Sequence, residues 1–164
     1  MGTDDRVRTP DPVLVHATTV AREGRAVLLR GPSGAGKSDL ALRLLALPAP
    51  GGLPSSLPTG GFVLVADDQT RIENRDGRLI ASAPAAIAGR IEVRGIGIVA
   101  LPFAGEAEVT LVADLVAPGE AERLPEPATA TLLGVVIPLV RVTPFEGSAP
   151  LKVALALATA RQDT

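Results

Sequence analysis

The sequence predicts an α/β fold in which a mixed sheet carries flanking helices, and two observations lead to this prediction. First, short apolar runs rich in β-branched residues recur along the chain between turn residues, as in 62–66 (FVLVA). Second, one such run, 26–30 (AVLLR), leads through a glycine-rich loop into a segment of helical composition. Strand-like segments outnumber helical ones, which favours mixed strand pairing over a regular alternation of strands and helices.

Each expected element follows from local composition. The β-branched run 13–20 (VLVHATTV) predicts one strand, and the helix expected at 38–47 ends before Pro48, which cannot continue it. The dipeptide Asp76-Gly77 between two short runs predicts a β-hairpin. The other expected elements are strands at 62–66, 91–101 (interrupted by Gly95 and Gly97), 108–116 and 132–142, one helical turn at 84–88, a last helix at 148–161, and a Pro-, Gly- and Ser-rich linker at 48–61.

Composition narrows the class of protein. A chain of 164 residues with 46% apolar residues suits one globular domain, expected at 12–162 after a flexible tail at 1–11. The formal net charge is −2 and no basic run occurs, which argues against a nucleic-acid partner. Cysteine is absent, which excludes disulfides and thiolate chemistry. No apolar run is long enough to span a membrane, so a cytoplasmic protein is expected.

The segment 31–38 (GPSGAGKS) matches the P-loop pattern G-x-x-x-x-G-K-[ST] without a mismatch. Its glycines allow successive backbone N–H groups to turn inward around phosphate oxygens, and the following helix adds its positive N-terminal end. The lysine is expected to reach the β- and γ-phosphates, and the last serine to offer its hydroxyl to Mg²⁺. The residues expected to bind nucleotide are Gly31, Pro32, Ser33, Gly34, Ala35, Gly36, Lys37 and Ser38.

Two adjacent carboxylates, Asp67 and Asp68, follow the apolar run 62–66 and are expected to point to opposite sides. In P-loop enzymes an acid at a strand end helps to hold Mg²⁺, and a second acid could accept a proton from the acceptor hydroxyl. A solvated turn is the alternative, and the P-loop upstream favours a functional pair. The single histidine, His16, lies among aliphatic residues, where a core position is its more common role.

Four motifs in a fixed order carry a resemblance to a known family. They are HATTVA from His16, GPSGAGKSDLALRLL from Gly31, LVADDQTRIE from Leu64, and IASAPAAIAGRIEVRGIGIV from Ile80. Together they resemble the HPr kinase/phosphorylase family, over about residues 16–103 and more weakly to about 160. The P-loop is common to many families, so the E-x-R-G-x-G-I stretch is the more specific signal. The chain is most similar to the short alphaproteobacterial form, which lacks the family's N-terminal domain.

The resemblance implies a P-loop kinase domain related to phosphoenolpyruvate carboxykinase, assembled as a hexamer and using ATP and Mg²⁺. It implies phosphorylation of a serine on HPr, the phosphocarrier of the sugar phosphotransferase system, or on a nitrogen-branch paralogue. By position, Asp67 would be the base, with His16 beside it near the transferred phosphate, and Lys37 would hold the β- and γ-phosphates. Asp68, Ser38 and Glu92 would serve the metal, and Arg94, Gly95 and Gly97 would belong to a signature region near the active site and subunit contacts.

One stretch departs from the family pattern. Long members carry a basic P-[VP]-[KR]-x-G-R-N type loop before the last helix, whereas this chain has PFEGSAPLK at 144–152, with Glu146 where a basic residue is expected. The substrate contact is therefore expected to differ, and the reverse phosphorylase activity does not follow from the resemblance. Two other functions stay open: a kinase of a small-molecule acceptor, and a nucleotide-sensing regulator without catalysis. The Asp67-Asp68 pair favours catalysis, because a sensor needs only the metal-binding acid.

Overall fold

The computed structural model describes residues 9–48 and 61–160 of the chain. Most of the expected tail at 1–11 and of the expected linker at 48–61 lies outside the described residues. The elements in chain order are β1 (Val13–Val15), β2 (Ala17–Arg22), β3 (Arg25–Arg30), α1 (Lys37–Leu45), β4 (Phe62–Ala66), β5 (Thr70–Arg75), β6 (Arg78–Ser82), the 3₁₀ turn η1 (Ala85–Ile87), β7 (Arg90–Val93), β8 (Gly97–Ala100), β9 (Ala107–Leu115), β10 (Ala128–Leu132), β11 (Val135–Val142) and α2 (Ala149–Thr159).

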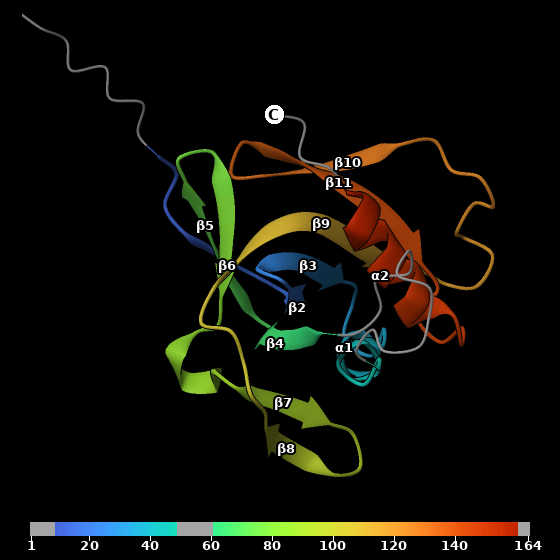
Figure 1. The fold of residues 1–164 in the computed structure, drawn as a ribbon, viewed down its shortest axis with the longest axis horizontal. Coiled ribbons are helices and arrows are strands. Elements are labelled where there is room, and N and C mark those ends of the chain that lie inside the picture. Colours follow the sequence, from blue (N-terminus) through green and yellow to red (C-terminus); the bar gives the residue numbers. More distant parts are fainter. Residues whose placement is uncertain (1–8, 49–60, 161–164) are drawn as a thin grey trace, which may run out of the picture.

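The main sheet is mixed, which confirms the predicted fold class. Its strand order is β1-β5-β6-β9-β3-β2-β4, and β11 pairs in parallel with β9 and antiparallel with β10. The parallel pair β3–β9 lies at its centre, so the carboxyl ends of both strands meet at one edge. The P-loop leaves the sheet at that edge, between β3 and α1 (Figure 1).

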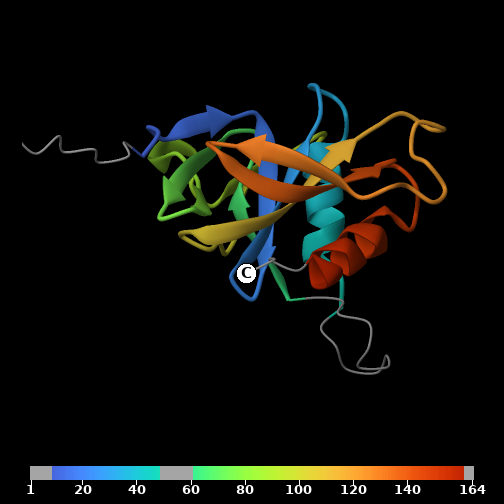
Figure 2. The ribbon, with the colours of Figure 1, turned by 90° about the horizontal axis from the view of Figure 1, so that it is seen from above.

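Two apolar cores lie on the two faces of the sheet. On one face α1 and α2 pack side by side (Figure 2), and Leu40 and Leu44 of α1 belong to the same buried cluster as Leu29 of β3. On the other face the sheet curls so that the hairpins β5–β6 and β10–β11 enclose a second core, which includes Leu28 and Ile72. Leu28 and Leu29 are adjacent and fully buried on opposite faces, as expected for a central strand covered on both sides.

Truncating a side chain in the helical core is expected to destabilise the domain. Leu40 is fully buried, so Leu40→Ala should lower the free energy of unfolding by about 2–5 kcal/mol, as for other large-to-small core changes. Leu155 in α2 is 39% exposed, and Leu155→Ala should cost far less. Urea unfolding of both variants measures the difference, and equal losses would contradict the packing described.

Three expected elements differ from the structure. The run 13–20 is not one strand: a bend at His16 separates β1, which pairs with β5, from β2, which pairs with β3. The run 91–101 is a hairpin, because left-handed Gly95 and Gly97 reverse the chain between β7 and β8, which form a separate small sheet (Figure 1). The strand expected at 132–142 is part of a hairpin: β10 begins at Ala128 and ends at Leu132, and a turn at Leu133-Gly134 joins it to β11.

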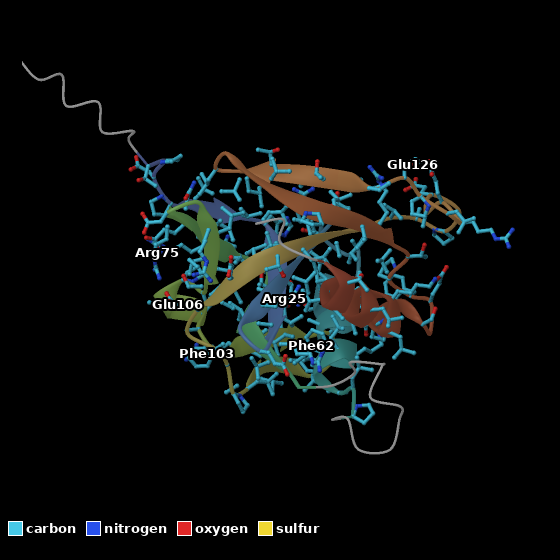
Figure 3. All side chains as sticks on the ribbon, turned by 45° about the horizontal axis from the view of Figure 1, so that its top comes forward. Arg25, Phe62, Arg75, Phe103, Glu106 and Glu126 are labelled. Atoms are coloured by element: carbon cyan, nitrogen blue, oxygen red, sulfur yellow. The ribbon has the colours of Figure 1, made fainter. Side chains whose placement is uncertain are left out.

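One expected turn is confirmed, and three further features complete the description of the fold. Asp76-Gly77 forms the turn of the β5–β6 hairpin, with both residues at positive φ. Pro138 pairs only with β10, because contact of β11 with β9 begins at the next residue, so no hydrogen bond to β9 is lost there. Arg75 at the end of β5 is paired with Glu106 before β9 at 3.0 Å (Figure 3). In the described ranges, 9–48 and 61–160, no helix is long and apolar enough to cross a membrane.

Candidate active site

The start of the P-loop is fixed by the two central parallel strands. Arg30, the last residue of β3, donates two hydrogen bonds to Asp114 of β9 at 2.7 and 3.0 Å. These bonds raise the pKa of Arg30 above its ordinary value, so the guanidinium stays charged. The next residue, Gly31, has no room for a side chain, since a Cβ there would lie 2.9 Å from the Cβ of Ala35. The end of β3 and the first residue of the P-loop are therefore held in place relative to β9.

The loop has the backbone shape that a phosphate cradle needs. Gly34 and Gly36 have φ values of 82° and 97°, in the left-handed region that favours glycine. A Cβ on Gly36 would also lie 2.8 Å from the ring of Phe145, which comes from the segment before α2. Lys37 is buried, and its Nζ donates to the carbonyl oxygens of Gly31 and Pro32 at 2.8 and 3.1 Å. Its ammonium group therefore lies against the loop.

A β-bulge turns Asp67 toward the P-loop. In the β2–β4 pair, Val20 is opposite Leu64 but Thr19 is opposite Ala66, so β4 carries one extra residue. This insertion reverses the alternation of side chains beyond the bulge. Asp67 consequently lies on the same face as Thr18 and α1, where a regular strand would have turned it to the other face.

Asp67 is buried and accepts three hydrogen bonds. Its Oδ1 accepts from the hydroxyl of Ser38 at 2.6 Å and from the hydroxyl of Thr18 at 3.0 Å. Its Oδ2 accepts from the backbone N–H of Glu92 at 2.9 Å. The carboxylate is thus held by the last residue of the P-loop, by strand β2 and by strand β7 of the β7–β8 hairpin.

Asp68 lies in a different environment from Asp67. It is exposed, and its Oδ1 is 2.7 Å from Nε2 of His16 at the bend between β1 and β2. The resemblance implied that His16 sits beside Asp67, and that expectation is corrected here: the imidazole pairs with Asp68. The interpretation of His16 as a core residue is also wrong, because its side chain is 47% exposed. Both differences have the same cause: the chain bends at His16, whereas the sequence predicted one continuous strand over 13–20.

Of the residues in the E-x-R-G-x-G-I stretch, Glu92 contacts the site, and the others lie in the β7–β8 hairpin away from it. Glu92 in β7 reaches Asp67 through its backbone N–H, while the residue itself is exposed. Arg94, Gly95 and Gly97 lie at the exposed turn between β7 and β8. The structure therefore brings together Lys37, Ser38, Asp67, Asp68 and His16, and it joins Glu92 to them by its main chain.

The residues present fit a nucleoside triphosphate with Mg²⁺. The loop offers open glycine backbone at Gly34, where nothing lies within 4 Å of an added Cβ. Ser38 and Asp67 bring a hydroxyl and a carboxylate together, which are oxygen ligands of the kind that Mg²⁺ prefers. Within the described residues no cluster of three or more His, Cys, Asp or Glu could hold a metal ion alone. Mg²⁺ usually takes one or two carboxylates together with substrate phosphates, and Asp67 beside Ser38 offers one such carboxylate.

Comparison with known proteins identifies the family. A family profile described as "HPr Serine kinase C-terminal domain" matches residues 10–153. The chain belongs to this family. The match includes the P-loop, both aspartates and the hairpin β7–β8, so the residues of the site lie within the family domain.

Relatives of the HPr serine kinase C-terminal domain include both sequences and a solved structure. The HPr kinase/phosphorylase of Clostridium tetani (strain Massachusetts / E88) is 38% identical over 88 residues, covering 54% of this chain and 25% of that protein. That of Geobacillus sp. (strain WCH70) is 40% identical over 86 residues, covering 52% and 24%. The Hpr(Ser) kinase/phosphatase from Coxiella burnetii has a similar structure, with a TM-score of 0.71 and 26% identity, covering 89% of this chain and 94% of that one. The matched segment spans about a quarter of the curated relatives.

In this member of the family, the segment 144–152 is held close to the P-loop. Arg43 of α1 donates to the carbonyl oxygens of Pro144 and Glu146. The carboxylate of Glu146 accepts from Lys152 at 2.6 Å, so the acidic residue found in place of a basic one is paired within its own segment. The segment thus carries a paired carboxylate and ammonium group near Phe145, which lies against the loop at Gly36.

Two residues of the site were not predicted from the sequence. Thr18 is completely buried and bonded to Asp67, and the only hint in the sequence was a pair of adjacent threonines in a largely apolar run. Phe145 lies against Gly36 although it is 69% exposed, and its signal was the scarcity of aromatic residues, of which the chain has three. The sequence could not show which residue each of them contacts, because both contacts join segments far apart in sequence.

Proposed function

We propose that this domain is an ATP-dependent protein kinase that phosphorylates a serine on an HPr-type phosphocarrier protein. The observation that carries the proposal is the hydrogen bond from Ser38 to Asp67, which joins the phosphate-binding loop to the aspartate pair. This contact supports a position for Asp67 close to the phosphates of a bound nucleotide. The family membership and the kinase names of its relatives support HPr as the acceptor.

The contacts favour a division of roles between the two acids that reverses the one implied by the resemblance. The Ser38 hydroxyl donates a hydrogen bond to Asp67, and a P-loop serine with a strand-end aspartate is the pair that holds Mg²⁺ in P-loop enzymes. We therefore propose Asp67, with Ser38, as the metal-side carboxylate. Asp68 is exposed and paired with His16, which suits a group that faces an incoming hydroxyl. Glu92 would contribute to the metal site only as a supporting residue.

The proposed reaction is an in-line phosphoryl transfer. The serine oxygen of the acceptor forms a bond to the γ-phosphorus, the bond from that phosphorus to the β–γ bridging oxygen breaks, and ADP leaves. Asp68 accepts the serine proton, and His16 orients its carboxylate. Lys37 and the loop amides hold the β- and γ-phosphates in position. Bound Mg²⁺ supplies neutralisation of the phosphate charge.

A phosphotransfer assay tests the proposal. The purified chain with ATP, Mg²⁺ and the HPr of the same organism should add one phosphate to one serine of HPr, located by mass spectrometry. Two controls are HPr with that serine replaced by alanine and the enzyme variant Lys37→Ala, and neither should give product. A folded sample that binds ATP but leaves HPr unmodified would overturn the proposal.

The same assay separates the two alternatives. Turnover of ATP with a small-molecule acceptor and none with HPr would indicate a metabolite kinase. Binding of ATP without turnover on any acceptor would indicate a nucleotide sensor. The nitrogen-branch paralogue of HPr, the hexamer and the cytoplasmic location stay predictions from the sequence and its resemblance.

A further inference from the structure

We propose that Thr18 is a positioning residue that fixes both aspartates of the site through one hydroxyl group. The inference rests on the proposed function, because it concerns how the acids of that site are held. Thr18 lies in β2, is completely buried, and touches neither the P-loop glycines nor the lysine by any hydrogen bond described for it. It acts, in this proposal, only through Asp67 and Asp68.

The Thr18 hydroxyl has a donor role and an acceptor role, and both are used. Its Oγ1 donates to Oδ1 of Asp67 at 3.0 Å. The same oxygen accepts the backbone N–H of Asp68 at 3.1 Å. Because a hydroxyl carries one proton, the bond to Asp67 sets its rotation and leaves its lone pairs facing the Asp68 amide. One side chain therefore fixes the carboxylate of the first acid and the main chain of the second.

The second bond stabilises a strained turn. Asp68 has a φ of 63°, which is uncommon outside glycine, and the N–H of Gln69 donates to the carbonyl oxygen of Asp67 at 2.7 Å. A bond from residue i+2 back to residue i around a positive φ is the rare, strained form of γ-turn. Such conformations persist only where the surroundings hold them, and Thr18 supplies a bond to the central amide of this turn. The turn is what sends the Asp68 side chain toward His16 rather than along the strand.

The neighbouring residue provides a matched control. Thr19 is also completely buried, but as the next residue in β2 it points to the opposite face of the sheet, where its hydroxyl meets that of Thr70 at 2.7 Å. Thr70 also donates to the carbonyl oxygen of Ala17, so it keeps that bond when Thr19 is changed. Thr18→Val and Thr19→Val therefore remove the same group from the same strand at equal burial. Only the first removal affects the acids.

Kinetics of the phosphotransfer reaction test the role in catalysis. Thr18→Val should lower kcat about tenfold to a hundredfold, as for other residues that orient a metal-side ligand, with little change in the KM for HPr. The Mg²⁺ concentration that gives half-maximal rate should rise, since Asp67 loses one of its hydrogen bonds. Thr18→Ser, which keeps the hydroxyl, should restore most of the rate, and Thr19→Val should stay near wild type. A merely structural role would not give this rescue and this contrast.

Amide hydrogen exchange tests the positioning without any activity. In Thr18→Val the Asp68 amide loses its acceptor and should exchange at least about tenfold faster, whereas Thr19→Val should leave it unchanged. Wild-type kcat together with unchanged Asp68 exchange in Thr18→Val would overturn the inference. If the wild-type chain itself fails to phosphorylate HPr, the proposed function is rejected, and the exchange of the Asp68 amide alone decides the role of Thr18.

Discussion

Replacing Asp67 with asparagine is expected to lower the rate of phosphoryl transfer on the order of a thousandfold and to raise the Mg²⁺ requirement. The charge of this carboxylate lies 2.6 Å from the Ser38 hydroxyl, and an amide cannot replace it as a ligand of a hard cation. The asparagine would also bring an NH₂ group against N–H and O–H donors, which should lower the free energy of unfolding by about 1–3 kcal/mol. Rates measured across a Mg²⁺ series, with a thermal melt of each variant, check both effects.

Asp68→Asn provides the contrast to Asp67→Asn. Its side chain is exposed and has His16 as its partner, so the fold should be little affected. The proposed loss of the base should lower kcat by about a hundredfold or more, while the Mg²⁺ requirement stays that of the wild type. If instead Asp68→Asn raises the Mg²⁺ requirement and Asp67→Asn leaves it unchanged, the division of roles implied by the sequence resemblance is the correct one.

Gly36→Ala is expected to weaken ATP binding strongly, because two separate obstacles meet at this position. The φ of 97° is unfavourable for any residue with a Cβ, at a cost of about 1–2 kcal/mol. The new Cβ would also lie 2.8 Å from the Phe145 ring, so either the ring or the loop must move. We expect the dissociation constant for ATP to rise by at least about tenfold, since each tenfold corresponds to about 1.4 kcal/mol. Isothermal titration calorimetry measures this change.

Two further variants separate the obstacles. Gly24 in the β2–β3 turn has a φ of 77° and nothing within 4 Å of an added Cβ, so Gly24→Ala carries the backbone cost without the collision. It should lower stability and leave ATP affinity unchanged. Adding Phe145→Ala to Gly36→Ala removes the collision and should recover part of the affinity. No recovery would mean that the backbone angle alone accounts for the loss.

The P-loop could be predicted from the sequence because its signal is local. Gly31 to Ser38 and the helix that follows are consecutive, and the strand before them is a continuous apolar run. The hairpin at Asp76-Gly77 was predictable for the same reason. Such features depend on residues within one or two turns of each other, and distant packing does not overrule them.

The orientation of the acids could not be predicted, because it depends on pairing between distant strands. Alternation along 62–66 says only that Asp67 and Asp68 point to opposite sides, and it does not reveal the extra residue in β4 that appears on pairing with β2. The partner of His16 was missed for a related reason, since the bend after β1 depends on β1 pairing with β5 rather than continuing into β2. The role of Thr18 follows from both features and became visible only in three dimensions.

The hydrogen bonds from Arg43 to the segment before α2 have a consequence for the surface charge beside the P-loop. The guanidinium binds main-chain oxygens of Pro144 and Glu146, and these two hydrogen bonds do not involve the side chain of residue 146. The identity of residue 146 can therefore change the electrical character of the surface next to the P-loop while the backbone stays in place.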